Sequence, residues 1–150
     1  MLDLLDEAFK GPSWHGPTLL GSLRGVTATR AAWRPAKGRH NIWEIVVHTA
    51  YWKYAVRRRL TGEKRGRFAL KGSNWFARPS AGRTWEDDVK VLVEQHAQLR
   101  ETVRRLPRRR LRAIVAHGRD TAAYTIRGIA AHDLYHAGQI QLLKRLMPKR

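Results

Sequence analysis

Residues 129–147 read IAAHDLYHAGQIQLLKRLM, and the spacing of their larger side chains decides the fold class. Steps of three or four residues connect Ile129, His132, His136, Ile140, Leu143 and Met147. That spacing is typical of the buried face of an α-helix. Two histidines therefore stand where aliphatic side chains are expected, with their Cβ atoms about 5–6 Å apart. Two imidazoles at that separation are close enough to bind one metal ion.

A second stretch, residues 41–60, predicts another helix with a buried face. Asn41 and Glu44 have the spacing of a capping box, which marks a helix N-terminus. The inward positions, again at steps of three and four, are Ile45, His48, Trp52, Val56 and Leu60. A third histidine is thus expected on a core face. His15, His40 and His117 fit no such face.

Two further helices complete the predicted fold. One is expected from Ser13 to Gly25 with Ser13 as its N-cap, and one from Thr84 to Leu106, where Pro107 ends it. Thr125 is expected to cap the helix that contains His132. Four amphipathic helices without a strand pattern of comparable strength predict an all-α four-helix bundle.

Residues 61–83 separate the second and third predicted helices and show no sustained period. They contain five helix-breaking residues, Gly62, Gly66, Gly72, Pro79 and Gly82. A loop of this length inside a bundle predicts a crossover along its outside. Phe68, Trp75 and Phe76 are expected to pack this crossover against the helices.

The composition limits the class of protein. A chain of 150 residues without cysteine has the size of a single domain, residues 1–150, that needs no disulfides, and its metal ligands are limited to His, Asp and Glu. No run of 18 apolar residues exists, and the acidic N-terminus does not resemble a signal peptide. These features predict a soluble cytoplasmic protein with no membrane partner.

The formal net charge of +18 points to polyanionic partners. The positive residues are scattered over every segment, with one dense cluster formed by Arg104, Arg105, Arg108, Arg109, Arg110 and Arg112. A solvated arginine-rich surface is the simpler interpretation, because no nucleic-acid recognition motif is present. A basic module that contacts nucleic acid and holds a structural metal is therefore the alternative function.

The chemistry follows from His48, His132 and His136. Three buried imidazoles on facing helices are hard to satisfy separately, so we expect them to share a divalent metal ion. Three neutral ligands leave an open coordination position, as in catalytic zinc sites. The affinity order and the ligand type favour zinc or nickel over iron or copper. His96 lies on the inward face of the third helix, where a hydrogen-bonded core histidine is the more common case.

Other residues near the three histidines are assigned weaker roles. Trp52 and Gln139, each one turn from a histidine, and Tyr135, next to His136, are candidate pocket residues. Glu44, Asp133 and Gln139 are also candidate acceptors for the outer N–H groups of metal-bound imidazoles. The more ordinary interpretation makes Glu44 the capping-box partner and Asp133 a surface or interface residue.

Three segments also resemble one family. The element HDLYHAGQI (residues 132–140) with the upstream WEIVVH (residues 43–48) resembles the DinB/YfiT-like family of metalloenzymes, and SWHGPTLLGSL (residues 13–23) resembles the first helix of many members. The resemblance implies a bundle in up-down-down-up order with a long crossover between helices two and three. It also implies a divalent metal at His48, His132 and His136.

The resemblance further implies an activity. Some relatives are thiol S-transferases that use low-molecular-weight thiols, and others resemble maleylpyruvate isomerases. We therefore expect a metal-dependent transferase that joins a small thiol to an electrophile, or a hydrolase that uses the same metal. A homodimer, common among relatives, is expected to form through apolar helix positions such as Val46, Val47 and Ala50.

Overall fold

The computed structural model describes residues 1–64, 66 and 68–148. The described residues form helices and no strand. The helices are α1 (Leu2–Phe9), α2 (Leu19–Ser22), α3 (Ala28–Ala32), α4 (Ile42–Thr61), α5 (Trp85–Arg105), the short 3-10 helix η1 (Arg108–Arg112) and α6 (Ala122–Leu146).

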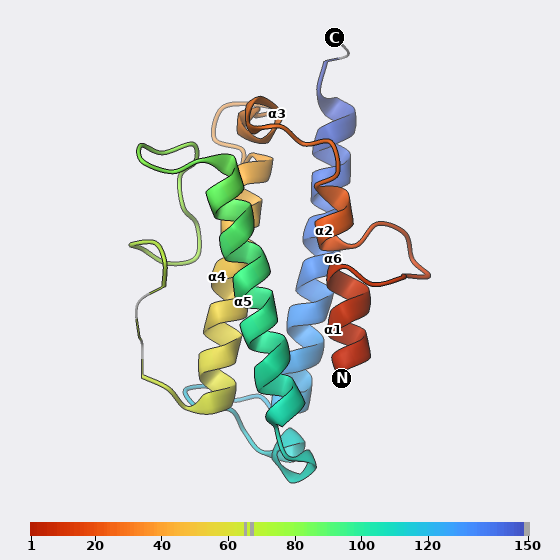
Figure 1. Cartoon of the computed structure of the whole chain (residues 1–150), viewed down its shortest axis with the longest axis vertical. Coiled ribbons are helices and arrows are strands. Elements are labelled where there is room, and N and C mark those ends of the chain that lie inside the picture. Colours follow the sequence, from red (N-terminus) through yellow and green to blue (C-terminus); the bar gives the residue numbers. More distant parts are fainter. Residues whose placement is uncertain (65, 67, 149–150) are drawn as a thin grey trace.

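The long helices form a bundle in up-down-down-up order. Figure 1 shows α1 and α2 following one another in the same direction beside α6, whereas α4 and α5 both run the opposite way and α6 returns. α4 packs against both α5 and α6, and α6 also contacts α1 and α2. The segment between α4 and α5 crosses back along the outside of the bundle (Figure 1). The predicted fold class, order and crossover are confirmed, with α1 and α2 sharing the first position.

The start of α4 follows the prediction. The Asn41 side chain accepts a hydrogen bond from the Glu44 amide, and the Glu44 carboxylate accepts one from the Asn41 amide. Both groups of the capping box are therefore satisfied. At the other end Gly62 adopts φ 78°, a left-handed conformation that glycine tolerates and that ends the helix.

Two predicted helix starts are wrong. Ser13 to Pro17 form a loop in which Gly16 has φ 115° and Trp14 is 96% exposed. Helix α2 begins only after Thr18, whose hydroxyl accepts a hydrogen bond from the Gly21 amide. Similarly, α6 is capped by Thr121 and not by Thr125, because a cap residue four positions earlier already satisfies the first free amides.

The bundle core also contradicts the proposed dimer face. Val46, Val47 and Ala50 are each no more than 1% exposed within the single chain. They belong to the hydrophobic core, because α4 packs against α3, α5 and α6. A homodimer through these side chains is therefore excluded. Within the described residues, no helix is both long enough and apolar enough to cross a membrane.

Candidate metal centre

Three histidines from two helices meet between α4 and α6. His48 belongs to α4, and His132 and His136 lie one turn apart on α6. The Nε2 atom of His132 lies 3.1 Å from Nε2 of His48 and 3.1 Å from Nε2 of His136. One ring nitrogen from each histidine can be chosen so that all three nitrogens lie within 4.8 Å of one another. The cluster could therefore hold a metal ion. The structure thus brings the three predicted ligands together.

In two of the three rings, the nitrogen that points away from the cluster, Nδ1, has a hydrogen-bond partner. Nδ1 of His48 lies 2.9 Å from the carbonyl oxygen of Asn74, and Nδ1 of His136 lies 2.7 Å from Oε1 of Gln139. Both oxygens only accept hydrogen bonds, so both Nδ1 atoms carry the proton. The Nε2 atoms of these two rings consequently direct lone pairs at the centre of the cluster, as metal ligands do.

His132 reveals why the cluster fits a cation. Its Nε2 atom lies 3.1 Å from the Nε2 lone pairs of both His48 and His136 but carries at most one proton. At least one of these two contacts is therefore not a hydrogen bond. Its Nδ1 atom is buried without a hydrogen-bond partner. A divalent ion among the three Nε2 atoms would remove the repulsion between facing lone pairs. The donor set, three neutral imidazoles, suits a divalent metal ion.

Burial keeps the cluster unprotonated. Burial, followed by the charges of neighbouring histidines, lowers the pKa of His132 to about 3. Burial likewise lowers the pKa of His136 to about 4, and it lowers the pKa of His48 despite the hydrogen bond to Asn74. The three rings are therefore neutral at pH 7, which is the form that binds metals.

The crossover segment covers one side of the cluster. Trp75 stacks on His48, with 3.9 Å between ring centroids, and His40 stacks on the other face of the same indole at 3.6 Å. Asn74, with φ 63°, also accepts a hydrogen bond from Trp52 Nε1 at 2.9 Å. Sequence reasoning missed Asn74, and it excluded His40 because that residue precedes the helix and has no place in a helical face.

His40 is held by an acidic residue at the start of α4. The Glu44 carboxylate contacts Nδ1 of His40 at 2.9 Å and the guanidinium of Arg34. Burial opposes ionisation of Glu44, but hydrogen bonds from Arg34, His40 and the Arg78 amide lower its pKa to about 2. Glu44 is thus both the predicted capping-box residue and the anchor of the wall beside the cluster.

Two cavities flank the histidine cluster. The larger, of about 590 Å³, opens beside His136 and is mostly apolar, with Tyr135, Leu142, Leu146, Trp75, His40 and Gln139 among its lining residues. The smaller, of about 180 Å³, opens beside His132 and is lined in part by Trp52. The three predicted pocket residues thus lie at these cavities: Trp52 at the smaller, Tyr135 and Gln139 at the larger.

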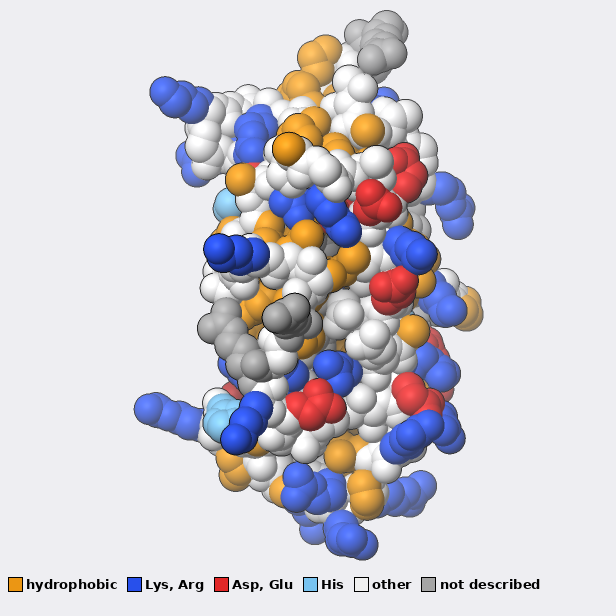
Figure 2. All heavy atoms as spheres, turned by 60° about the vertical axis from the view of Figure 1, so that its left-hand side comes forward, with side chains coloured by type: hydrophobic (Ala, Val, Ile, Leu, Met, Phe, Trp, Pro, Cys, Tyr) orange, Lys and Arg blue, Asp and Glu red, His pale blue; other side chains and the backbone are white. Residues whose placement is uncertain are grey.

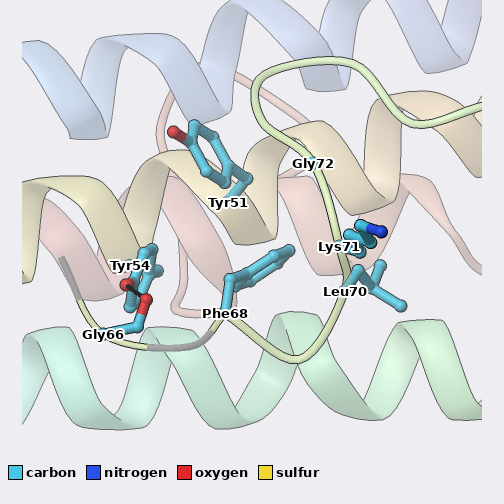
Figure 3. A pocket seen from close by; sticks show the side chains of 7 residues that line it. All are labelled: Tyr51, Tyr54, Gly66, Phe68, Leu70, Lys71 and Gly72. Atoms are coloured by element: carbon cyan, nitrogen blue, oxygen red, sulfur yellow. Dashed lines mark hydrogen bonds between the residues drawn. The ribbon is translucent and has the colours of Figure 1, made fainter.

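A third cavity lies under the crossover and contains none of the three histidines. It measures about 420 Å³, and Figure 3 shows Tyr54 of α4 beside Gly66 and Phe68 of the crossover segment. The ring centroid of Phe68 lies 5.5 Å from that of Tyr51 and 5.4 Å from that of Tyr54. The Tyr54 hydroxyl donates a hydrogen bond to the Gly66 carbonyl at 2.6 Å. Aromatic side chains thus pack the crossover onto α4, as the sequence predicts.

Asp133 is a fully buried residue, so its predicted surface or interface role is wrong. Its carboxylate pairs with the ammonium of Lys53 on α4, and both side chains are 0% exposed. The reason is that α6 contacts α4 on one side and α1 and α2 on another, so the position next to His132 also points inward. His96 lies apart from the three histidines and stacks on Phe9 at 3.7 Å.

The positive charge is spread over the surface. Figure 2 shows lysine and arginine side chains over the whole visible face of the molecule, with several at its lower end. Within the described residues, Arg104 and Arg105 pair with Glu101, whereas the four arginines of η1 form no ion pair. The surface therefore presents a broad positive field with one arginine-rich end.

The fold and the cluster define a class: a four-helix bundle in which two facing helices present three histidines suited to one metal ion. The family model of the DinB superfamily matches residues 14–140. The chain belongs to the DinB superfamily. Comparisons with curated proteins and with solved structures found no match.

Proposed function

We propose that this protein binds one divalent cation, zinc or nickel, through His48, His132 and His136, and that it is a metal-dependent enzyme. The observation that carries the proposal is the convergence of three Nε2 atoms, two of which direct lone pairs at a third only 3.1 Å away. A purely structural role would not need cavities on both sides of the cluster.

The proposed reaction is the transfer of a low-molecular-weight thiol to an electrophile. A divalent cation held by the three histidines would lower the pKa of a bound thiol, or of water in a hydrolase, and so would supply a nucleophile at neutral pH. The apolar cavity beside His136 suits the electrophile, because burying an apolar body there favours binding. The sulfur–carbon bond forms as the leaving group departs with its electron pair, and the thiol proton passes to solvent.

The chain's own residues would prepare the site in two ways. The Asn74 carbonyl and Gln139 hold two imidazoles in the tautomer that exposes Nε2. Trp75, stacked on His48, excludes water from one side of the cluster.

Metal analysis after expression and dialysis tests the first step. Wild-type protein is expected to retain one equivalent of metal, and His132→Ala is expected to lose it, because two imidazoles bind more weakly than three. His15→Ala, which removes an exposed histidine outside the cluster, is the matched control. Equal metal content in wild type and His132→Ala would refute the assignment. A screen of thiols against electrophiles with metal-loaded protein then tests turnover.

A basic binding module remains the second proposal, because the arginines of η1 are exposed and unpaired within the described residues. Any protein with this charge binds DNA at low salt by counterion release. Nucleic-acid binding as the main function predicts tight binding that persists near ~0.2 M salt. Loss of binding at that salt concentration would leave only a non-specific electrostatic surface.

A further inference from the structure

The small cavity beside His132 carries two opposite charges. It lies between the second half of α4 and the first turns of α6, and its lining includes Arg59 and Asp120 besides His132 and Trp52. Gly128, one turn before His132, also lines it and leaves room because it has no side chain. No apolar ligand would need this pair of charges.

Both charges are available to a ligand. Among the described residues, neither Arg59 nor Asp120 takes part in an ion pair, although both line this cavity. The Arg59 guanidinium lies over the Trp52 ring, 5.8 Å from its centroid, which limits its freedom. The backbone on both sides is fixed: the Arg59 carbonyl accepts a hydrogen bond from the Ala116 amide, and the Asp120 carbonyl accepts one from the Val115 amide.

We propose that this cavity is the thiol subsite and that it selects a small zwitterionic thiol of the α-amino-acid type, such as cysteine. The inference rests on the proposed thiol transfer and names its donor. Arg59 binds the carboxylate, and Asp120 binds the ammonium group. The thiol then points toward His132 and the cluster, while the electrophile occupies the larger cavity on the other side.

The charges and the size both support this choice. A ligand with only a negative charge is repelled by Asp120, and one with only a positive charge is repelled by Arg59, so a zwitterion is favoured over either. The cavity of about 180 Å³ is smaller than the roughly 300–1,000 Å³ of sites for drug-sized ligands, whereas the cavity at His136 lies within that range. The cavity beside His132 therefore matches a ligand of amino-acid size.

Binding of thioethers tests the subsite without requiring metal or turnover. S-methyl-L-cysteine keeps the two charges and has no free thiol. S-methylcysteamine lacks the carboxylate, and S-methyl mercaptopropionate, the thioether 3-(methylthio)propionate, lacks the ammonium group. Titration calorimetry of the full chain, with ligand-observed NMR for weak complexes, is expected to show a preference of roughly tenfold or more for S-methyl-L-cysteine, because each charge-assisted hydrogen bond contributes about that factor.

Two variants assign the charges to their partners. Arg59→Met is expected to bind S-methyl-L-cysteine and S-methylcysteamine equally, and Asp120→Asn is expected to lose the preference over S-methyl mercaptopropionate. Arg109→Met, which removes an equal charge from the exposed η1 helix, should keep the wild-type preferences. A general loss of folding would not produce these two opposite patterns.

The outcomes separate the two proposals. If the three thioethers bind wild-type protein equally, or if Arg109→Met changes selectivity as Arg59→Met does, the zwitterion subsite is refuted. If the selectivity is as expected but His132→Ala retains its metal, the subsite stands and the metal assignment fails.

Discussion

Replacing Lys53 by methionine should destabilise the protein more than any surface change. The Lys53 ammonium is 0% exposed, pairs with the equally buried Asp133 and lies over the Phe9 ring, with Nζ 5.0 Å from the ring centroid. Methionine keeps most of the stem, so the variant removes chiefly the charge. It leaves a carboxylate in the core whose Oδ1 atom already lacks a hydrogen-bond partner.

The magnitude follows from this burial. Burial lowers the pKa of Lys53 and raises the pKa of Asp133, and only their mutual contact opposes both changes. Removing one partner of a buried pair costs about 3–5 kcal/mol, a large part of the roughly 5–15 kcal/mol that stabilises a typical domain. Replacing both, as Lys53→Met with Asp133→Leu, should recover most of the loss because no charge is then left in the core.

Urea unfolding of the metal-free proteins, followed by circular dichroism, measures these differences. The matched control is Arg104→Met, which breaks an exposed pair with Glu101 and should leave the free energy of unfolding nearly unchanged, because water screens exposed charges. A cost below about 1 kcal/mol for Lys53→Met would show that the two groups do not form a buried pair. A double variant as unstable as the sum of the single variants would show that they act independently.

Two further predictions concern the histidines. Gln139→Leu removes the oxygen that accepts the hydrogen bond from Nδ1 of His136, so metal affinity should fall roughly 10–100-fold while the fold persists. A competition titration with a chelating dye measures this affinity, and an unchanged value would contradict the role of Gln139. Burial, followed by the charge of Lys53, lowers the pKa of His96 to about 3. Below pH 6.5, His96 therefore becomes protonated in the unfolded chain while it stays neutral in the folded protein. The free energy of unfolding should therefore be constant above pH 6.5 and fall by up to about 1.4 kcal/mol per pH unit below it for each such histidine, and His96→Phe should reduce that slope in urea titrations.

The helices and the three histidines were predictable because their signals are local. A face repeats every three or four residues, so His48, His132 and His136 could be assigned to the interior without knowledge of the partners. The capping box of Asn41 and Glu44 is equally local, and it marked the start of α4 correctly. The start of α2 was misjudged because Ser13 and Thr18 are both suitable caps, and only the backbone at Gly16 decides between them.

The interior of α6 was only half predictable. Its histidine face follows from spacing, but the burial of Asp133 depends on α1 and α2 covering a second face of the same helix. The partner of Asp133, Lys53, lies 80 positions away in the sequence, on α4. No periodic pattern reports such a contact, because it is set by how the helices pack and not by either helix alone.

The crossover contributes to the site in a way that spacing could not reveal, and this has a consequence for the metal. α4 and α6 bring three imidazoles together, but a histidine can present either ring nitrogen. The Asn74 carbonyl accepts the proton of His48 Nδ1, and Trp75 lies flat against the ring, so the crossover decides that Nε2 faces His132. A segment without helical period therefore sets the tautomer of a proposed ligand. Changes in this loop should alter metal affinity even though the loop supplies none of the three ligands.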